Sequence, residues 1–315
     1  MPLPTSRDVH VDAILTNISV AYIQKSSNFI ATKVFPIVPV TKKSDKYFKY
    51  TKNDWFRDEA QIRADAEESA GGGYNIATDD YSCDTWAFHK DIGDETRKNA
   101  DAPINVDREA TEFVAGRILL KMETEWVSNY FGASIWGTDV TPTGWDNYTA
   151  SDPLDDIEDG KRAVLVTTGF EPNTLVLGYD VYKALKNHPD LVDRIKYTTS
   201  ENVTTAIMAK LFEVDKVLVA KAVKATNNEG ATPAYGFTHG KHALLCYSAP
   251  TAGLLQPSAG YVMAWKGVSD GLGETVATTR LRIPLRKADR IESEASWDMK
   301  VVGTDLGYFF SSVVS

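Results

Sequence analysis

Two short groups of residues could in principle do chemistry. His239, His242 and Cys246 lie close together in the sequence. A zinc site built from them needs a fourth ligand or an open water position, and a frame that aims all three side chains. Cys246 instead lies in an apolar run, so we expect no metal here. Cys83 and His89 could form a nucleophile–base pair, but they fall on an expected surface hairpin, and we interpret their spacing as incidental.

Other motifs also fail to specify a site. The acidic residues at 152–159 do not have the spacing of an EF-hand loop, and acids gather at helix N-termini for electrostatic reasons. The glycines at 71–73 lack the lysine and hydroxyl of a phosphate loop, and Gly271 and Gly273 lack the third glycine of a dinucleotide fingerprint. We therefore expect no enzyme and no catalytic, cofactor-binding or metal-binding residue.

The chain carries two local groups of basic residues. One is Lys42, Lys43, Lys46, Lys49 and Lys52, and the other is Arg280, Arg282, Arg286, Lys287 and Arg290. The net charge of −9 argues against a general grip on nucleic acid, which needs a basic face. We expect the lysines to contact acidic surfaces of a neighbouring protein. On one continuous strand the four arginines share a face, which is either solvated or paired with acids across an interface.

Composition bounds the class of protein. The chain has 315 residues, of which 43% are hydrophobic and 24% charged, ordinary values for a globular protein. Two distant cysteines do not support a disulfide framework and favour a reducing compartment. The sequence has no run of about 20 apolar residues that would cross a membrane, and we expect no membrane partner.

A long amphipathic segment, residues 107–131, predicts one helix. Ala115, Leu119, Met122, Trp126 and Tyr130 recur at helical spacing, and Asp107 is the expected cap. Before it, residues 46–90 have strand-like texture on both sides of the glycine triplet, which indicates a hairpin. An arm of about 15 residues a side would reach roughly 50 Å, and such a ribbon is not stable alone.

The remaining segments complete an expected α+β order. Residues 1–45 are expected to form an extended arm, with a short helix over Val11–Tyr22 and an apolar stretch at 34–40. Two prolines make that stretch an edge strand or a segment lying along another surface. A second helix begins at Asp152-Pro153. Residues 170–250 predict a compact α/β lobe, and strands are expected at 275–286, 291–302 and 308–314.

This order of elements resembles the major capsid proteins of tailed bacteriophages, which share the HK97-type fold with encapsulin shells. The local texture of Asn173–Leu185 and the closing Tyr308-Phe309-Phe310 add to the resemblance. The resemblance implies an N-terminal arm at 1–45, an extended loop at 46–92, a peripheral domain at 93–168 and 258–315 around a spine helix at 107–131, and an axial domain at 169–257. The closing strands would belong to the peripheral domain.

The resemblance also implies function and partners. The chain would assemble with itself, as pentamers and hexamers, into an icosahedral phage head that encloses double-stranded DNA without sequence specificity. A separate scaffolding protein, a portal and a decoration protein would be partners, with assembly in the host cytoplasm and a final place in the virion. An encapsulin-like compartment, and an enzyme that uses the lobe at 170–250, stay open as alternatives. The expected contacts between subunits are Phe35, Ile37, Trp55, Phe56, Arg280 and Arg282. Removal of residues 1–40 is expected to leave a soluble fold but no closed shells.

Overall fold

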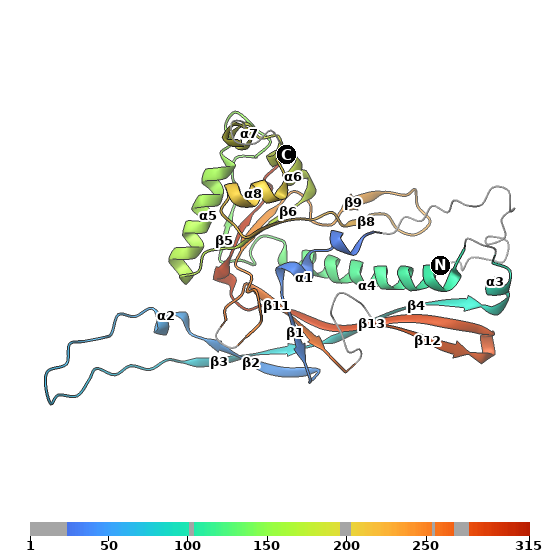
Figure 1. The fold of residues 1–315 in the computed structure, drawn as a ribbon, viewed down its shortest axis with the longest axis horizontal. Helices are drawn as coiled ribbons and strands as arrows, with labels where there is room; N and C mark the ends of the chain where they lie inside the picture. The colour runs from blue at the N-terminus through green and yellow to red at the C-terminus, as the bar shows by residue number, and fades with distance from the viewer. Residues whose placement is uncertain (1–23, 101–103, 196–202, 254–255, 268–276) are drawn as a thin grey trace.

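A computed structural model describes residues 24–100, 104–195, 203–253, 256–267 and 277–315. The expected helix at Val11–Tyr22 and the glycines at 271 and 273 lie outside these residues. The described chain forms two five-stranded sheets, a long helix beside the first sheet, and shorter helices around the second (Figure 1). This mixture of helix and sheet confirms the predicted α+β class.

The first sheet carries the long helix. Its strands run in the order β1 (Ile37–Val40), β11 (Gly260–Trp265), β13 (Ala288–Val301) and β12 (Ala277–Ile283), and β4 (Asp84–Gly93) also pairs with β13. β1 and β11 are parallel, and β13 is antiparallel to β11, β12 and β4. Alternate residues of β13, including Ala295, Trp297 and Met299, are buried, as the period of a strand with one face on a core requires.

Helix α4 (Val106–Tyr130) is the predicted spine helix, and it packs along β13 and β4. Its buried apolar stripe is Val106, Ala110, Val114, Ile118, Met122 and Trp126. The stripe confirms Met122 and Trp126 but contains Val114 and Ile118 in place of Ala115 and Leu119, because its members recur at every fourth residue. The cap is also different: the Asn105 side chain accepts a hydrogen bond from Arg108 N at 3.1 Å.

The second sheet forms the α/β lobe. Its strands run in the order β5 (Thr138–Val140), β14 (Gly307–Phe310), β10 (Ala243–Cys246), β6 (Thr174–Leu177) and β7 (Lys216–Val219). The helices of the lobe are α5 (Pro153–Thr168), α6 (Tyr179–Lys186), α7 (Pro189–Ile195) and α8 (Thr205–Leu211). Every residue of β6, β10 and β14 is buried, which explains their continuous apolar runs.

The pairing of β14 corrects one expectation. The closing strand lies between β5 and β10 in the lobe, and not with β13 in the first sheet. Helix α5 also packs its buried residues Leu154, Ile157 and Val164 into the lobe core. The predicted start of α5 is confirmed, since the Asp152 side chain accepts from Leu154 N and Asp155 N. The lobe therefore contains segments on both sides of the range 169–257.

The predicted hairpin exists but its paired part is shorter. β2 (Ser44–Tyr50) pairs with β3 (Ile76–Ser82), and the residues between them, 51–75, include only the one-turn helix α2 (Lys52–Trp55). Beyond Ser82 the chain enters β4 of the first sheet. A second small ribbon joins β8 (Val223–Ala225) to β9 (Tyr235–Phe237). The remaining short elements are η1 (Ser26–Asn28), α1 (Ala31–Val34), α3 (Asp94–Lys98), η2 (Pro284–Arg286) and η3 (Thr304–Leu306).

The described part of the arm is built into its own subunit. Ile30, Val34 and Phe35 are buried in the core between α4 and the first sheet, and β1 is the edge strand beside β11. Of the two interpretations of residues 34–40, the edge strand is the one observed. The expected effect of removing residues 1–40 is therefore wrong: the deletion would take away core side chains and a strand, so the fold itself would suffer.

Candidate assembly surfaces

The loop at 51–75 projects from the body (Figure 1), and it carries exposed aromatic rings. Trp55 and Phe56 are 54% and 59% exposed. At the base of the loop Tyr50, Trp55 and Tyr74 form a ring cluster, with the centroids of Trp55 and Tyr74 5.5 Å apart. Asp54 holds the start of the returning strand β3, because its carboxylate accepts a hydrogen bond from Asn75 N at 2.9 Å. Large exposed rings held in place by their neighbours are suited to contact another protein surface.

The two arm residues expected at an interface have different environments. Phe35 is fully buried against Trp126, Tyr130 and Trp136 of its own chain, so its ring has no surface left for a neighbouring subunit, and the expected contact is corrected to an intrachain one. Ile37 is partly buried and packs against the same core. Its remaining surface leaves the predicted contact a prediction.

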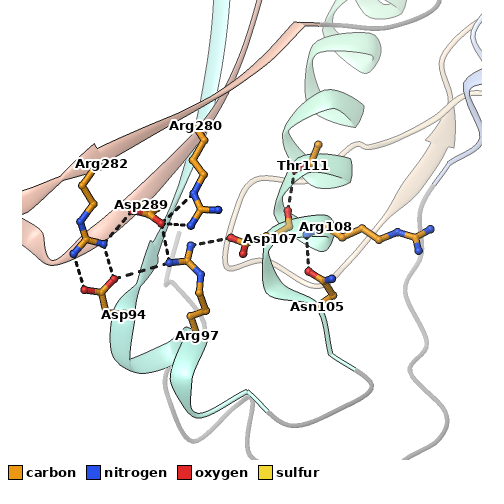
Figure 2. A network of polar contacts seen from close by, with 9 residues as sticks. All are labelled: Asp94, Arg97, Asn105, Asp107, Arg108, Thr111, Arg280, Arg282 and Asp289. Carbon is orange, nitrogen blue, oxygen red and sulfur yellow. Dashed lines mark hydrogen bonds and ion pairs between the residues drawn. The ribbon is translucent and has the colours of Figure 1, made fainter.

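Arg280 and Arg282 find their acids within the chain (Figure 2). Arg280 Nε donates to Asp289 at 3.0 Å, and Arg282 donates to Asp289 at 3.0 Å and to both oxygens of Asp94 at 2.6 Å. Arg97 joins the group by donating to Asp289 and Asp107, each at 2.8 Å. We call Asp94, Arg97, Asp107, Arg280, Arg282 and Asp289 the arginine cluster.

The arginine cluster ties the start of the spine helix to the end of the first sheet. Asp107 belongs to α4, Asp94 and Arg97 to α3, and the other three residues to β12 and β13. Arg280, followed by Arg282, holds the pKa of Asp289 well below its usual range, and Arg282 does the same for Asp94. The charges are thus matched inside one subunit. Arg280 and Arg282 remain 56% and 48% exposed, so their predicted contacts between subunits stay a prediction.

The four arginines do not lie on one strand. The chain turns at 284–287, where Lys287 has a φ of 48°, so Arg286 lies in the turn and Arg290 on β13. Both pair with Asp91 of β4, at 3.0 and 2.8 Å. The sequence signal for this turn was Pro284, whose ring ends the strand.

Sequence reasoning missed an exposed apolar position at this turn. Leu285 of η2 is 99% exposed, and Leu281 of β12 is 51% exposed. An apolar residue flanked by charged ones in a turn is the signal that could have found it.

The lysine group is partly neutralised by its own chain. Lys42 pairs with Asp45 at 2.7 Å, and Lys52 pairs with Asp305 of η3. Lys43 lies 6.0 Å from the ring centroid of Trp265. The predicted contact between these lysines and a neighbouring acidic surface stays a prediction.

The residues considered for chemistry are dispersed or buried. Cys83 is buried and its Sγ donates to Met263 O at 3.4 Å, whereas His89 is exposed and lies opposite Glu292. Burial raises the pKa of Cys83 to about 11 and that of Cys246 to about 12, which is the opposite of what a nucleophilic thiol needs. Among the residues that the structure describes, no group of three or more His, Cys, Asp or Glu side chains could hold a metal ion.

One arrangement has the composition of a catalytic triad but not its hydrogen bonds. His188 Nε2 lies 3.0 Å from Ser151 Oγ, and Asp190 Oδ2 is 3.5 Å from His188 Nδ1. Nδ1, however, accepts from the backbone N of Asp190, and Ser151 Oγ donates to Asn147 O. The proton of the ring is therefore on Nε2, facing the serine, so the imidazole cannot act as its base. These residues connect the helix starts of the lobe.

Comparison with known proteins finds similarity to phage proteins over most of the chain. No family profile matches it, and no helix within the described residues is long and apolar enough to cross a membrane. The major capsid protein of Burkholderia phage BcepMu is 27% identical over 315 residues, 96% of this chain and 96% of that protein. A phage-related protein from Bordetella bronchiseptica RB50 superposes with a TM-score of 0.69 and 24% identity, over 92% of this chain and 94% of that one.

The shell of a cyanophage, P-SCSP1u, has the same arrangement of elements. Its capsid structure gives a TM-score of 0.63 at 10% identity, over 98% of this chain and 94% of that one. The fold and the relatives agree along nearly the full length of the chain. The chain is therefore similar to phage major capsid proteins along nearly its full length and has the HK97-type fold.

Proposed function

We propose that the chain is the structural subunit of an icosahedral phage head that encloses double-stranded DNA, and that it has no catalytic role. The observation that carries the proposal is the similarity to a phage major capsid protein over 96% of both chains. The loop at 51–75, with Trp55 and Phe56 more than half exposed, supplies a surface for a neighbouring copy. Apolar rings of this size are costly to leave in water.

In this proposal the two sheets belong to different domains. The first sheet and α4 form the peripheral domain, and the lobe around the second sheet forms the axial domain that meets its equivalents in pentamers and hexamers. The lobe would include β5, α5 and β14 as well as residues 169–257, since these elements share its sheet and core. A rigid body with a projecting loop allows one chain to occupy positions of different curvature.

The other partners follow from the same proposal. A scaffolding protein would direct assembly in the host cytoplasm, a portal would occupy one vertex, and a decoration protein could cover the finished head. DNA would be enclosed by the shell without sequence specificity and not bound by it in general, since a chain of net charge −9 does not attract phosphates.

Negative-stain microscopy of the purified chain, expressed with and without the scaffolding protein of its phage, tests the proposal. Closed shells are expected from the wild-type chain. The double variant Trp55→Ser/Phe56→Ser should keep its circular dichroism spectrum but yield at least tenfold fewer shells. Tyr235→Ser, which removes a ring that is 73% exposed on β9, is the matched control.

Two outcomes would contradict the proposal. Rings, tubes or monomers from the wild-type chain under both conditions would exclude a shell subunit. Particles that protect an enzyme cargo, and not DNA, from added protease and nuclease would favour an encapsulin-like compartment.

A further inference from the structure

A buried carboxylate holds the arm to the spine helix. Glu123 of α4 is 1% exposed. Its Oε2 accepts from Ile30 N and Ala31 N, each at 2.9 Å, and its Oε1 lies 3.1 Å from Ile30 N. These two amides lie at the start of α1. The Glu123 side chain therefore anchors the segment that places Val34 and Phe35 in the core.

A buried histidine faces the same carboxylate. His239 Nε2 lies 3.5 Å from Glu123 Oε1 and has no hydrogen bond within the described chain. At the other side of the ring, Nδ1 lies 2.9 Å from Thr238 Oγ, and that hydroxyl donates to Ala222 O at 3.2 Å. Since the threonine proton is used, the Thr238 oxygen accepts from Nδ1–H. Nε2 is then an acceptor, and it needs a proton from Glu123.

The surroundings offer little to balance a charge on Glu123. Trp126 and Phe131 cover the histidine ring, with centroids 5.6 and 5.0 Å away. The one opposing charge from α1 is Lys33, whose ammonium is exposed and bonds Ser27 O at 3.0 Å. The loop before β10 carries His239, Lys241 and His242. His242 lies beyond Phe131, and Lys241 acts on the carboxylate of Asp146. Burial lowers the pKa of both histidines, so they are neutral at physiological pH.

We propose that Glu123 and His239 form a proton-operated latch that fastens residues 29–35 of the arm to the spine helix. With a proton on Glu123, the carboxyl group donates to His239 Nε2 while its oxygens still accept from the arm amides, and the site is neutral and fully bonded. Loss of that proton leaves a negative charge in an apolar core and an imidazole nitrogen without a donor. The arm then gains freedom to leave.

The direction of the pH dependence follows from burial. Burial raises the pKa of Glu123 from 4.5 to about 7, against the opposing effect of the arm amides and Lys33. When the arm detaches and water reaches the side chain, the pKa returns toward its ordinary value. The attached state therefore binds the proton more tightly. Attachment is strongest in acid, weakens as pH rises from 4.5 to about 7, and stays level above that.

Hydrogen exchange of the purified chain, followed by mass spectrometry, measures the latch. After correction for intrinsic exchange, protection of the amides at 30–35 should fall at least tenfold between pH 5 and pH 8, with a ceiling of about 70-fold over this range set by the two pKa values. Protection of Leu244 and Leu245 in β10 should not follow this curve.

Two variants identify the group. Glu123→Gln keeps a neutral acceptor for the arm and a donor for His239, so its arm protection should change by less than twofold over the same range. Glu109→Gln, on the exposed face of α4, is the matched control and should behave as the wild type. If Glu123→Gln does not fold, infrared spectroscopy of the wild type decides, since a protonated buried carboxyl band should disappear around a pH of about 7, where the fall in arm protection levels off.

The latch is overturned if wild-type arm protection is independent of pH, if Glu123→Gln keeps the full pH dependence, or if no protonated carboxyl is seen at pH 6. The inference rests on the proposed function only where it concerns the role of the arm in shell assembly. Shells without pH-dependent protection would remove the latch alone, and pH-dependent protection in a chain that never assembles would remove the proposed function alone.

Discussion

The spine helix α4 begins among arginines and aspartates and ends among buried aromatic rings. At its start, Asp107 reaches Arg97, which in turn bonds Asp289, at the outer end of the first sheet (Figure 2). At its end, Trp126 is completely buried and lies within 6 Å of the rings of Phe35, Phe131 and His239. Charge matching fixes direction and register at modest net gain, whereas burial of large rings contributes most of the free energy.

The two ends also differ in their titratable groups. Acids at the start have pKa values below their usual range, because arginines bond them. The acid near the end, Glu123, has a raised pKa because burial penalises its charge. One helix therefore has opposite responses to pH at its two ends, and the predictions below test that difference.

Trp126→Ala should have the largest effect. The substitution removes a fully buried indole and leaves a cavity between the arm and the helix, which costs about 3–5 kcal/mol of unfolding free energy. Urea denaturation followed by circular dichroism measures it. A loss under about 1 kcal/mol would show that the end of the helix is not the main source of stability.

Gly260→Ala should also destabilise the packing at the end of α4, because it disturbs Phe35 of the arm. A Cβ at this position would lie 2.5 Å from the Phe35 ring and 2.8 Å from Lys300 O, so the ring must move, at a cost of about 1–3 kcal/mol. Gly116→Ala in α4 is the control. Its Cβ would meet nothing within 4 Å, and alanine should stabilise the helix by roughly 0.5–1 kcal/mol.

Arg97→Met, at the start of α4, should lower the free energy of unfolding by less than Gly260→Ala. Arg97 is one-quarter exposed and makes two ion pairs of 2.8 Å, so we expect a loss of about 1–2 kcal/mol at low salt. Added salt should reduce the loss, because it screens partly exposed pairs. Equal losses at 0.05 M and about 1 M salt would contradict an electrostatic origin.

Acid should open the start of the helix and spare its end. Asp91, Asp94 and Asp289 have lowered pKa values in the folded chain. Their contribution is therefore present above the ordinary value of 3.8 and is lost as pH falls below it. Hydrogen exchange at pH 3 and pH 5 should show α3 and the first turn of α4 losing protection while residues 30–35 keep theirs. Loss at both ends together would argue against independent chemistry.

Local signals in the sequence predicted some of these features and not others. Asp152-Pro153 determines the start of α5 through bonds that span only three residues, and four-residue apolar runs give buried strands. The place of β14 depends on pairing with β10, more than 60 residues away in sequence, and no local pattern encodes that choice. The arginine cluster needs the register that puts Arg282 opposite Asp289, which the turn at 284–287 sets.

Glu123 was missed for a related reason. A single glutamate among apolar residues of a helix is ordinarily exposed or marks the edge of the polar face. Its burial depends on the arm, whose amides at the start of α1 need an acceptor. The sequence signal is weak because the partners, Ile30, Ala31 and His239, come from segments distant in the chain.

Asn105→Ala and Asp107→Ala should give the smallest losses, and together they separate two explanations of how the helix starts. The Asn105 side chain accepts from Arg108 N, and removal of such a cap costs about 0.5–2 kcal/mol, typically about 1. Asp107 was the cap expected from sequence, but its carboxylate bonds Arg97 instead. Asp107→Ala should therefore lose only a partly exposed ion pair, about 0–1 kcal/mol, and lose it in a salt-dependent way. The Asn105→Ala loss should not change with salt, because it removes a neutral hydrogen bond. If the two variants show the reverse salt dependence in urea denaturation, Asp107 is the cap, and the start of the helix owes less to the arginine cluster than its geometry indicates.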